Sequence, residues 1–455
     1  MKQFLKYVLA TITGIFLLMF IFFIVFASMV ASSSKKQTVK VEDNSVLHLK
    51  LNYQIFDKPQ NNPIDAFAAS LTGDMNKPVG LYDIVNSIEH AKTDDDIKGI
   101  FLDVSVLGAG YGKLSEIRAA IEDFKSEGKF VYAYSEMLYN QSYYFASVAD
   151  SVLLNPSGTM LFNGMAADIT FMKETLAKMG VEMQVVKRGK FKGAVEPFVL
   201  DKLSPENRKQ ITEYVESIYG DLIAKISASR GIDGDELRAI ADDVRVKTST
   251  DAVTHKLVDQ LAYRDQVMEM IKSATGDDEV NLITLPKYNN VVNPMGKKKS
   301  GKKIAVVYAD GSIVSGNGQS NEIGSDKFAK ALKQAREDDD VKAVVLRINS
   351  GGGSALASDV IWRETQLLKT KKPLIVSMGD VAASGGYYIA CLGDTIMAMP
   401  NTITGSIGVF GLYPNAEKLF DKVGLHSEIV KTSEMADFGS IDRPLNAKEL
   451  DFLDA

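Results

Sequence analysis

The stretch Asp94–Val104 (DDDIKGIFLDV) recurs as Asp338–Ile348 (DDDVKAVVLRI), 244 residues further along the chain. The same offset continues without a gap to Lys187 and Lys431. It relates Gly108 to Gly352, Tyr143 to Tyr387, Asp150 to Asp394, Pro156 to Pro400, Gly164 to Gly408 and Gly180 to Gly424. Self-similarity at one fixed period predicts that two parts of the chain share one fold.

Two positions at which the copies disagree carry reactive side chains. Ser384 in the second copy corresponds to Asn140 in the first, and Lys192 in the first copy corresponds to Ala436 in the second. Each copy therefore keeps one reactive group and lacks the other.

Short runs rich in β-branched residues alternate with amphipathic helical runs in both copies. The first copy is expected to have strands at 46–51, 97–104, 130–134, 151–154 and 181–186, and helices at 81–91, 113–124, 142–148 and 171–179. The second copy repeats the order, with strands at 304–308, 343–348, 374–378, 395–398 and 428–430. This alternation predicts an α/β fold with largely parallel sheets. The fold class is two tandem βαβ repeats with a helical arm, 204–273, between them.

The pattern divides the chain into four segments. We expect a transmembrane anchor at 1–34, a first repeat with its helical arm at 45–285, a linker at 286–302 and a second repeat at 303–455. The first repeat contributes the lysine and the second contributes the serine. The second copy ends at Ala455, where the counterpart of the helical arm begins, so we expect a C-terminally truncated fragment of a longer polypeptide.

The N-terminal segment is apolar enough to cross a bilayer. No charged residue occurs from Tyr7 to Ser34, and Ile15–Phe26 is continuously apolar. A cleaved signal peptide is the alternative, but its apolar core is usually about 7–15 residues, so an uncleaved membrane helix is favoured. Lysines lie on both sides of the span, and charge alone does not fix its orientation.

Composition excludes several classes of protein. The net charge is −6 and is spread along the chain, which argues against nucleic-acid binding. The single cysteine, Cys391, excludes an intramolecular disulfide framework and a cysteine metal cluster, and its apolar setting predicts a core position. No metal or other cofactor is implied.

A serine nucleophile needs a base to take its proton. The four histidines, His48, His90, His255 and His426, all fall in strand or helix patterns, where structural or surface roles are expected. A lysine can serve if burial or neighbouring cations keep it neutral. Lys192 is a candidate because apolar residues surround it and Lys187, Arg188 and Lys190 precede it.

Ser384 follows a predicted strand and a tight turn at Gly379-Asp380, and it opens a helix at Ala383–Tyr387. There its hydroxyl can face a cleft while backbone N–H groups at the helix start face an oxyanion. A helix N-cap is the alternative role. The glycine-rich turn Asn349–Ser354 favours the catalytic role, since it can supply a second oxyanion donor.

At these residues the chain resembles the long, membrane-anchored form of signal peptide peptidase, the protease IV type, within the caseinolytic-protease and crotonase fold group. The matching motifs are Asn349–Ser354, Ala382–Tyr387, Thr404–Gly408 and Lys192–Phe198. The resemblance implies a Ser/Lys dyad with Ser384 as nucleophile and Lys192 as general base. It also implies Gly352 and Gly385 as oxyanion donors and Ser406 as the residue that orients the lysine. Gly351 departs from the family, which usually has proline there, and this loosens the Gly352 assignment.

The resemblance implies crotonase-like repeats and a bowl-shaped homotetramer. It further implies an anchor in a bacterial inner membrane, with the catalytic part on the periplasmic side. Its substrates would be remnant signal peptides and other apolar peptides, and Leu412, Tyr413, Val409 and Phe410 are candidates for the groove. Two alternatives remain open, a crotonase-like acyl-CoA enzyme and a catalytically inactive scaffold.

Overall fold

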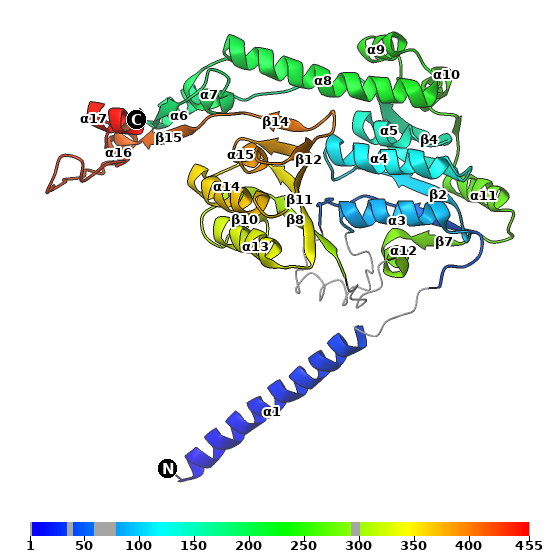
Figure 1. Ribbon diagram of the computed structural model, residues 1–455, viewed down its shortest axis with the longest axis horizontal. Helices are drawn as coiled ribbons and strands as arrows, with labels where there is room; N and C mark the ends of the chain where they lie inside the picture. Colours follow the sequence, from blue (N-terminus) through cyan, green and yellow to red (C-terminus); the bar gives the residue numbers. More distant parts are fainter. Residues whose placement is uncertain (1, 34–39, 59–78, 293–300, 455) are drawn as a thin grey trace.

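The structure is a computed structural model that describes residues 2–33, 40–58, 79–292 and 301–454 of the 455-residue chain. It is an α/β protein with two larger parallel sheets (Figure 1). One lies in residues 40–292, which we call the first half, and the other lies in residues 301–454, the second half.

The strands of each larger sheet pair in parallel. The first sheet has the order β6-β4-β3-β2-β1-β7, with β1 Ser45–Leu49, β2 Ile97–Val104, β3 Phe130–Tyr139, β4 Ser151–Leu161, β6 Gln260–Leu261 and β7 Leu282–Thr284. The second has the order β13-β12-β11-β8, with β14 also on β12; its strands are β8 Lys303–Asp310, β11 Val341–Ser350, β12 Leu374–Ala383, β13 Thr395–Met397 and β14 Ile403–Gly405. A small ribbon pairs β9 Ser312–Val314 with β10 Glu322–Gly324.

Helices lie between these strands in the chain order that the sequence predicts. They are α3 Leu81–Thr93, α4 Tyr111–Lys125 and α5 Asn140–Ala146 in the first half, and α13 Ser325–Glu337, α14 Ala355–Lys369 and α15 Gly385–Ala390 in the second. The helix α4 buries Leu114, Ile117, Ile121 and Phe124, which recur at helical spacing and share one core with the first sheet. Fully burying each such side chain contributes about 1.5–3 kcal/mol.

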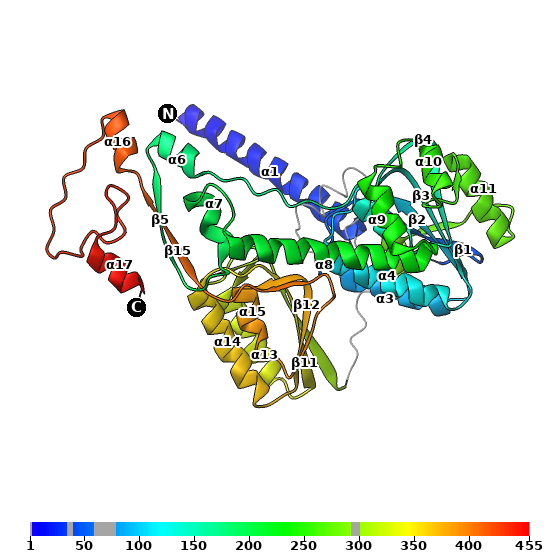
Figure 2. The same cartoon turned by 90° about the horizontal axis from the view of Figure 1, so that it is seen from above.

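The helical arm contains α8 Pro205–Arg230, α9 Gly234–Asp242, α10 Ser249–Thr254 and α11 Arg264–Thr275. In Figures 1 and 2, α8 runs past both halves of the molecule. The expectation of continuous helix over 204–273 is wrong at β6, which pairs with β4 as an edge strand. The Asp259 carboxylate accepts the Val152 N–H at 2.7 Å and anchors this connection to the sheet.

A second ribbon joins the two halves. Strand β5 Glu182–Lys187 of the first half pairs antiparallel with β15 Phe410–Asn415 of the second. Around it lie α6 Lys173–Met179, the 3₁₀ turn Gly193–Val195, α7 Glu196–Val199, α16 Glu417–Val423 and α17 Ala447–Asp454. The Leu419 N–H donates to the Gly180 carbonyl at 3.0 Å, so α6 and α16 meet end to end.

Three local expectations are wrong. Residues 428–430 form no strand, and the Val430 side chain is 95% exposed because it packs against no sheet. Gly379 and Asp380 lie inside β12, because this strand continues through a register shift to Ala383. Cys391 is exposed, since it follows the short helix α15 at its solvent side.

Two further helices bear on the expected segments. Helix α1, Lys2–Ser33, contains the span Lys6–Ile24, which is long and apolar enough to cross a membrane, and none of that span is buried against the protein. Helix α12, Leu285–Val292, occupies the start of the expected linker 286–302. The Tyr288 hydroxyl donates to Asp94 at 2.8 Å, which attaches this helix to the first half.

Candidate active site

Ser384 and Lys192, the two reactive residues from opposite halves, lie together. Lys192 Nζ is 3.0 Å from Ser384 Oγ. The two residues are 192 positions apart in the chain, and the contact is formed within one chain. At this distance a neutral lysine can take the serine proton directly.

Ser384 lies between the end of β12 and the start of α15, with φ 54° and ψ −120°. A positive φ is uncommon for a residue with a Cβ and is typical of strained functional positions. Its N–H donates to the Gly405 carbonyl at 2.9 Å, which holds this backbone conformation against β14. Ser384 occupies the N-cap position of α15, but its hydroxyl makes no hydrogen bond to the helix, so the hydroxyl does not have the capping role.

Lys192 immediately precedes the 3₁₀ turn Gly193–Val195, and its side chain is almost fully buried at 3% exposure. This burial lowers the pKa of the amine. The cations at Lys187, Arg188 and Lys190 are exposed, so desolvation, and not neighbouring charge, is the cause of the lowered pKa.

Ser406 makes two contacts with the amine. Lys192 Nζ is 2.7 Å from the Ser406 carbonyl oxygen and 3.1 Å from Ser406 Oγ. A neutral amine has two N–H groups and one lone pair. When the two N–H groups point to Ser406, the lone pair is left for the hydroxyl proton of Ser384.

The two expected oxyanion donors lie next to each other. Gly352 has φ 96°, and a Cβ there would be 2.5 Å from the Gly385 nitrogen and 2.9 Å from Ser384 Cβ, so only glycine fits this approach. The Gly352 N–H, however, donates to Ser350 Oγ at 3.1 Å. In this structure the Gly352 N–H is therefore engaged by Ser350. Sequence reasoning missed Ser350 because nothing in the motif indicates where its hydroxyl turns.

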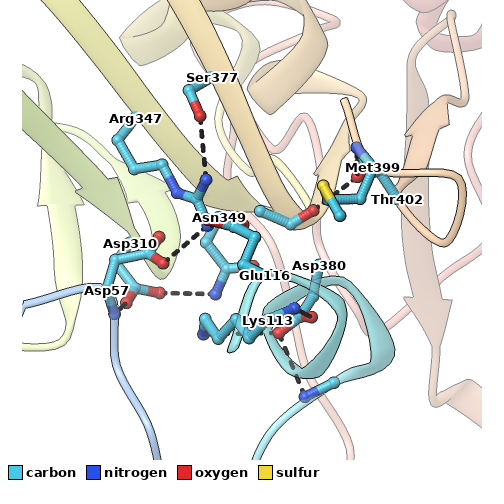
Figure 3. A network of polar contacts seen from close by, with 12 residues as sticks. Asp57, Lys113, Glu116, Asp310, Arg347, Asn349, Ser377, Asp380, Met399 and Thr402 are labelled. Atoms are coloured by element: carbon cyan, nitrogen blue, oxygen red, sulfur yellow. Dashed lines mark hydrogen bonds and ion pairs between the residues drawn. The ribbon is translucent and has the colours of Figure 1, made fainter. Parts of the chain in front are cut away.

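A buried ionic cluster connects the halves beside the site (Figure 3). Arg347 on β11 donates to Ser377 at 2.9 Å within its own sheet. Its other terminal nitrogen reaches Asp57 at 3.1 Å and Glu116 at 2.7 Å, both in the first half. Burial alone would lower the pKa of Arg347, but these two carboxylates outweigh it and raise the pKa. The guanidinium stays charged and holds α4 against β11.

Asp380 makes a second connection four residues before Ser384. Its carboxylate accepts the backbone N–H groups of Gly110 at 3.3 Å and Lys113 at 2.9 Å, at the start of α4. The buried Lys113 ammonium lies 3.5 Å from the same carboxylate. A carboxylate at a helix N-terminus is favourable, so the strand that leads to Ser384 caps a helix of the other half.

A third set of hydrogen bonds reaches the glycine-rich turn. The Asp310 carboxylate accepts from Asn349 Nδ2 at 2.9 Å and from the Asp57 N–H at 3.4 Å (Figure 3). Asn349 Oδ1 accepts the Val381 N–H at 3.2 Å. The turn before Gly352 and the strand before Ser384 are thereby fixed to each other and to the first half.

The groove candidates lie on or just before β15, the strand that follows Ser406 in the chain. Phe410, Leu412 and Tyr413 are on β15, where the backbone pairs with β5, and Phe410 is 46% exposed. Val409 is 54% exposed, and its carbonyl accepts the Arg188 N–H. His48 contacts Asp103 at 3.2 Å, a structural pairing in the first sheet.

Comparison with known proteins gives the family of the chain. The family model for peptidase family S49 matches residues 123–276 and 366–455. Protease 4 of Haemophilus influenzae is 33% identical over 432 residues, which is 91% of this chain and 70% of that protein. The chloroplastic serine protease SPPA of Arabidopsis thaliana is 30% identical over 91% of this chain and 61% of its own length. A putative signal peptide peptidase SppA of Enterococcus faecium is 35% identical over 31% of this chain and 42% of its own length.

These matches cover both halves, including the segments that carry Lys192 and Ser384. These matches favour a peptidase over the crotonase-like acyl-CoA enzyme that the sequence left open. The chain belongs to peptidase family S49, and it is a serine-type peptidase.

Proposed function

We propose that this chain is a membrane-anchored serine endopeptidase that works by a Ser384/Lys192 dyad and degrades remnant signal peptides and other apolar peptides. The observation that carries the proposal is the 3.0 Å contact between Lys192 Nζ and Ser384 Oγ. The buried amine has a lowered pKa, which is the property a lysine base needs.

The reaction would proceed through an acyl-enzyme. Ser384 Oγ attacks the peptide carbonyl carbon while its proton passes to Lys192 Nζ, and the C–N bond then breaks as the ammonium returns the proton to the leaving amine. Water then attacks the ester carbonyl while Lys192 takes its proton, and the bond between the acyl carbon and Ser384 Oγ breaks as the ammonium returns that proton to Oγ. The Gly385 N–H would donate to the oxyanion. The Gly352 N–H would join it after leaving Ser350, and Ser406 would orient the amine through its carbonyl and hydroxyl.

The two halves are proposed to be copies of one crotonase-like unit. Supporting this, α3 and α13, α4 and α14, and α6 and α16 have bounds that differ by the sequence offset of 244. We propose the segments 45–285 and 303–455 as the repeats, with α12 attached to the first. Neither repeat alone holds both members of the dyad, so hydrolysis requires the joined halves.

The N-terminal helix is proposed as an uncleaved anchor in a bacterial-type inner membrane, with the catalytic part on the periplasmic side. The exposed apolar span Lys6–Ile24 supports a membrane location. Signal peptides that remain in the membrane after processing would then lie near the site. No nucleic acid or cofactor takes part in this proposal.

The substrate proposal is tested with two peptides of equal length in detergent micelles. An apolar signal-peptide core is expected to have a kcat/KM at least about tenfold above that of a polar peptide with the same scissile residues, because apolar side chains gain from leaving water. The rates are measured by mass spectrometry of the products. Equal rates for both peptides would remove the proposed substrate class and leave the peptidase activity standing.

A homotetramer is proposed because equivalent helix faces differ in exposure. The face of α4 is covered by the second half, whereas the equivalent face of α14 is exposed. Gly112 and Glu116 of α4 contact the second half, whereas Leu356 and Val360, at the same positions of α14, are 70% and 39% exposed. The α14 face of one chain would pack on the first half of the next, near Met137, which is 49% exposed. Such head-to-tail contacts close into a ring when the rotation from one chain to the next is a whole fraction of a turn.

Sedimentation in detergent tests this assembly. The wild-type chain is expected to sediment as a tetramer, and Leu356→Glu with Val360→Glu as a monomer, since two charges would be buried in the contact. Tyr263→Glu, at an exposed residue outside this face, is the matched control. A double variant that remains tetrameric would refute the proposed contact.

A further inference from the structure

We propose that Glu196 is a positioning residue for Lys192, because its buried carboxylate fastens the turn that carries the lysine to the first turn of α8. This inference rests on the Ser/Lys dyad proposed above. It adds a residue that touches neither the serine nor the lysine amine.

The Glu196 side chain is 1% exposed, and three hydrogen bonds satisfy its carboxylate. Its oxygens accept the Ser204 N–H at 3.1 Å, the Ser204 hydroxyl at 2.5 Å and Asn207 Nδ2 at 2.9 Å. Ser204 is the N-cap of α8 and also accepts the Asn207 N–H. The carboxylate thus binds the first turn of a 26-residue helix, where negative charge is favourable.

Glu196 does not act as a proton carrier. Burial alone would raise its pKa, but the hydrogen bonds from Ser204 and Asn207 outweigh burial and lower the pKa. The group therefore stays ionised at neutral pH, and its influence on the lysine is mechanical.

The lysine turn packs directly on this connection. A Cβ at Gly193 would lie 2.3 Å from Asn207 Cγ, so the backbone next to Lys192 rests on the Asn207 amide. The Lys192 N–H donates to Gly189 at 3.2 Å, which closes the turn from the other side. Movement of the first turn of α8 would therefore move Lys192.

The helix α8 is also tied to the second half. Asn401 Nδ2 donates to Asp221 on α8 at 2.8 Å and lies 3.2 Å from Ser115 Oγ on α4. Asn401 lies two residues before β14, and β14 leads to Ser406, which accepts hydrogen bonds from the Lys192 amine. One helix thus positions both the lysine turn and the strand that orients the amine.

The test measures labelling of Ser384 by a fluorophosphonate against pH, followed by mass spectrometry of the intact chain. Glu196→Gln places an amide N–H₂ group against the hydrogen-bond donors of Ser204 and Asn207, and it is expected to loosen the turn that carries Lys192. Lys192 then meets water and its protonation returns toward that of an exposed lysine. The midpoint of the labelling profile is expected to move to higher pH, and the plateau rate is expected to fall at least about tenfold, since small misplacement of a reacting group is costly.

A second substitution is designed to restore the contact. In Glu196→Gln with Asn207→Asp, the new amide donates to the new carboxylate, and both labelling midpoint and plateau are expected to return most of the way to wild type. Asp251→Asn is the matched control, because Asp251 also accepts three hydrogen bonds, from Lys247 and Thr248, at the α10 end of the arm (Figure 1). It is expected to change thermal stability but neither the midpoint nor the plateau.

Glu196→Gln that folds and keeps the wild-type midpoint and plateau would overturn the proposal. If Glu196→Gln does not fold, Glu196→Asp is used instead, because it keeps the negative charge and shortens the side chain by one methylene. An unchanged labelling midpoint in Glu196→Asp would also overturn the proposal. Lys192→Met separates the two hypotheses. If Lys192→Met is labelled as fast as the wild type, the proposed dyad is refuted. If labelling depends on Lys192 but not on Glu196, only the positioning role of Glu196 is refuted.

Discussion

Ser384→Ala is expected to lose peptide turnover by at least about 10⁴-fold while keeping the wild-type fold, because the hydroxyl is the proposed nucleophile. The substitution removes one oxygen from a half-buried side chain whose hydroxyl contact is with Lys192. The backbone that holds residue 384 is fixed by its N–H bond to Gly405, which alanine retains.

The measurement combines kcat/KM on an apolar peptide with thermal unfolding. Ser87→Ala is the matched control, because Ser87 is fully buried in α3 and lies outside the site. It is expected to keep wild-type turnover. Turnover by a folded Ser384→Ala variant at more than one hundredth of the wild-type rate would remove Ser384 from the mechanism.

Lys192→Met is expected to reduce kcat/KM by about 10²–10⁴-fold, the usual contribution of a general base. Methionine retains an unbranched chain of similar length and removes the amine. In the wild type, kcat/KM is expected to reach its maximum at pH values above the Lys192 pKa and to fall as the pH drops through that pKa. The reason is that only the neutral amine accepts the serine proton. Burial lowers that pKa, so the midpoint should lie below that of an exposed lysine.

Rates measured from acidic to alkaline pH test this expectation in both proteins. The alkaline rise should be absent from Lys192→Met, since no amine titrates there. A rise of the same midpoint in the variant would assign the titration to another group, and the histidines would be the first to examine.

The disagreement between the two copies predicted one reactive side chain in each half, and the resemblance to signal peptide peptidase implied that the two form a dyad. Lysine and serine occur in non-equivalent positions of the repeat, and this placed one reactive group in each half before any geometry was known. The alternation of strands and helices likewise predicted the α/β order, because its periodicity is local. The structure places Lys192, Ser384 and Ser406 within hydrogen-bond reach.

The contacts between the halves could not be predicted in the same way. Arg347 and Asp57 are 290 residues apart, and no local pattern indicates which charged residues will be buried together. The pairing of β5 with β15 was missed for a related reason. Strand 428–430 was expected from its sequence equivalence to β5, but β15 pairs with β5 and residues 428–430 have no partner strand in the described part of the second half.

The oxyanion turn shows the limit of motif reasoning at atomic scale. Gly352 was expected for its permissive backbone, and its φ of 96° agrees with that expectation. The direction of its N–H, toward Ser350 Oγ, depends on one peptide orientation in a turn with glycine at 351. Composition does not determine that orientation.

Chemical rescue of the lysine tests the split dyad most directly. In a Cys391→Ser background, which removes the single native cysteine, Lys192→Cys is treated with 2-bromoethylamine to form a lysine analogue with an amine at the same reach. The untreated variant is expected to be nearly inactive, and activity is expected to return in proportion to modified residue 192. Wild-type turnover before treatment, or no gain after complete modification of folded protein, would contradict the activation of Ser384 by an amine from the first half.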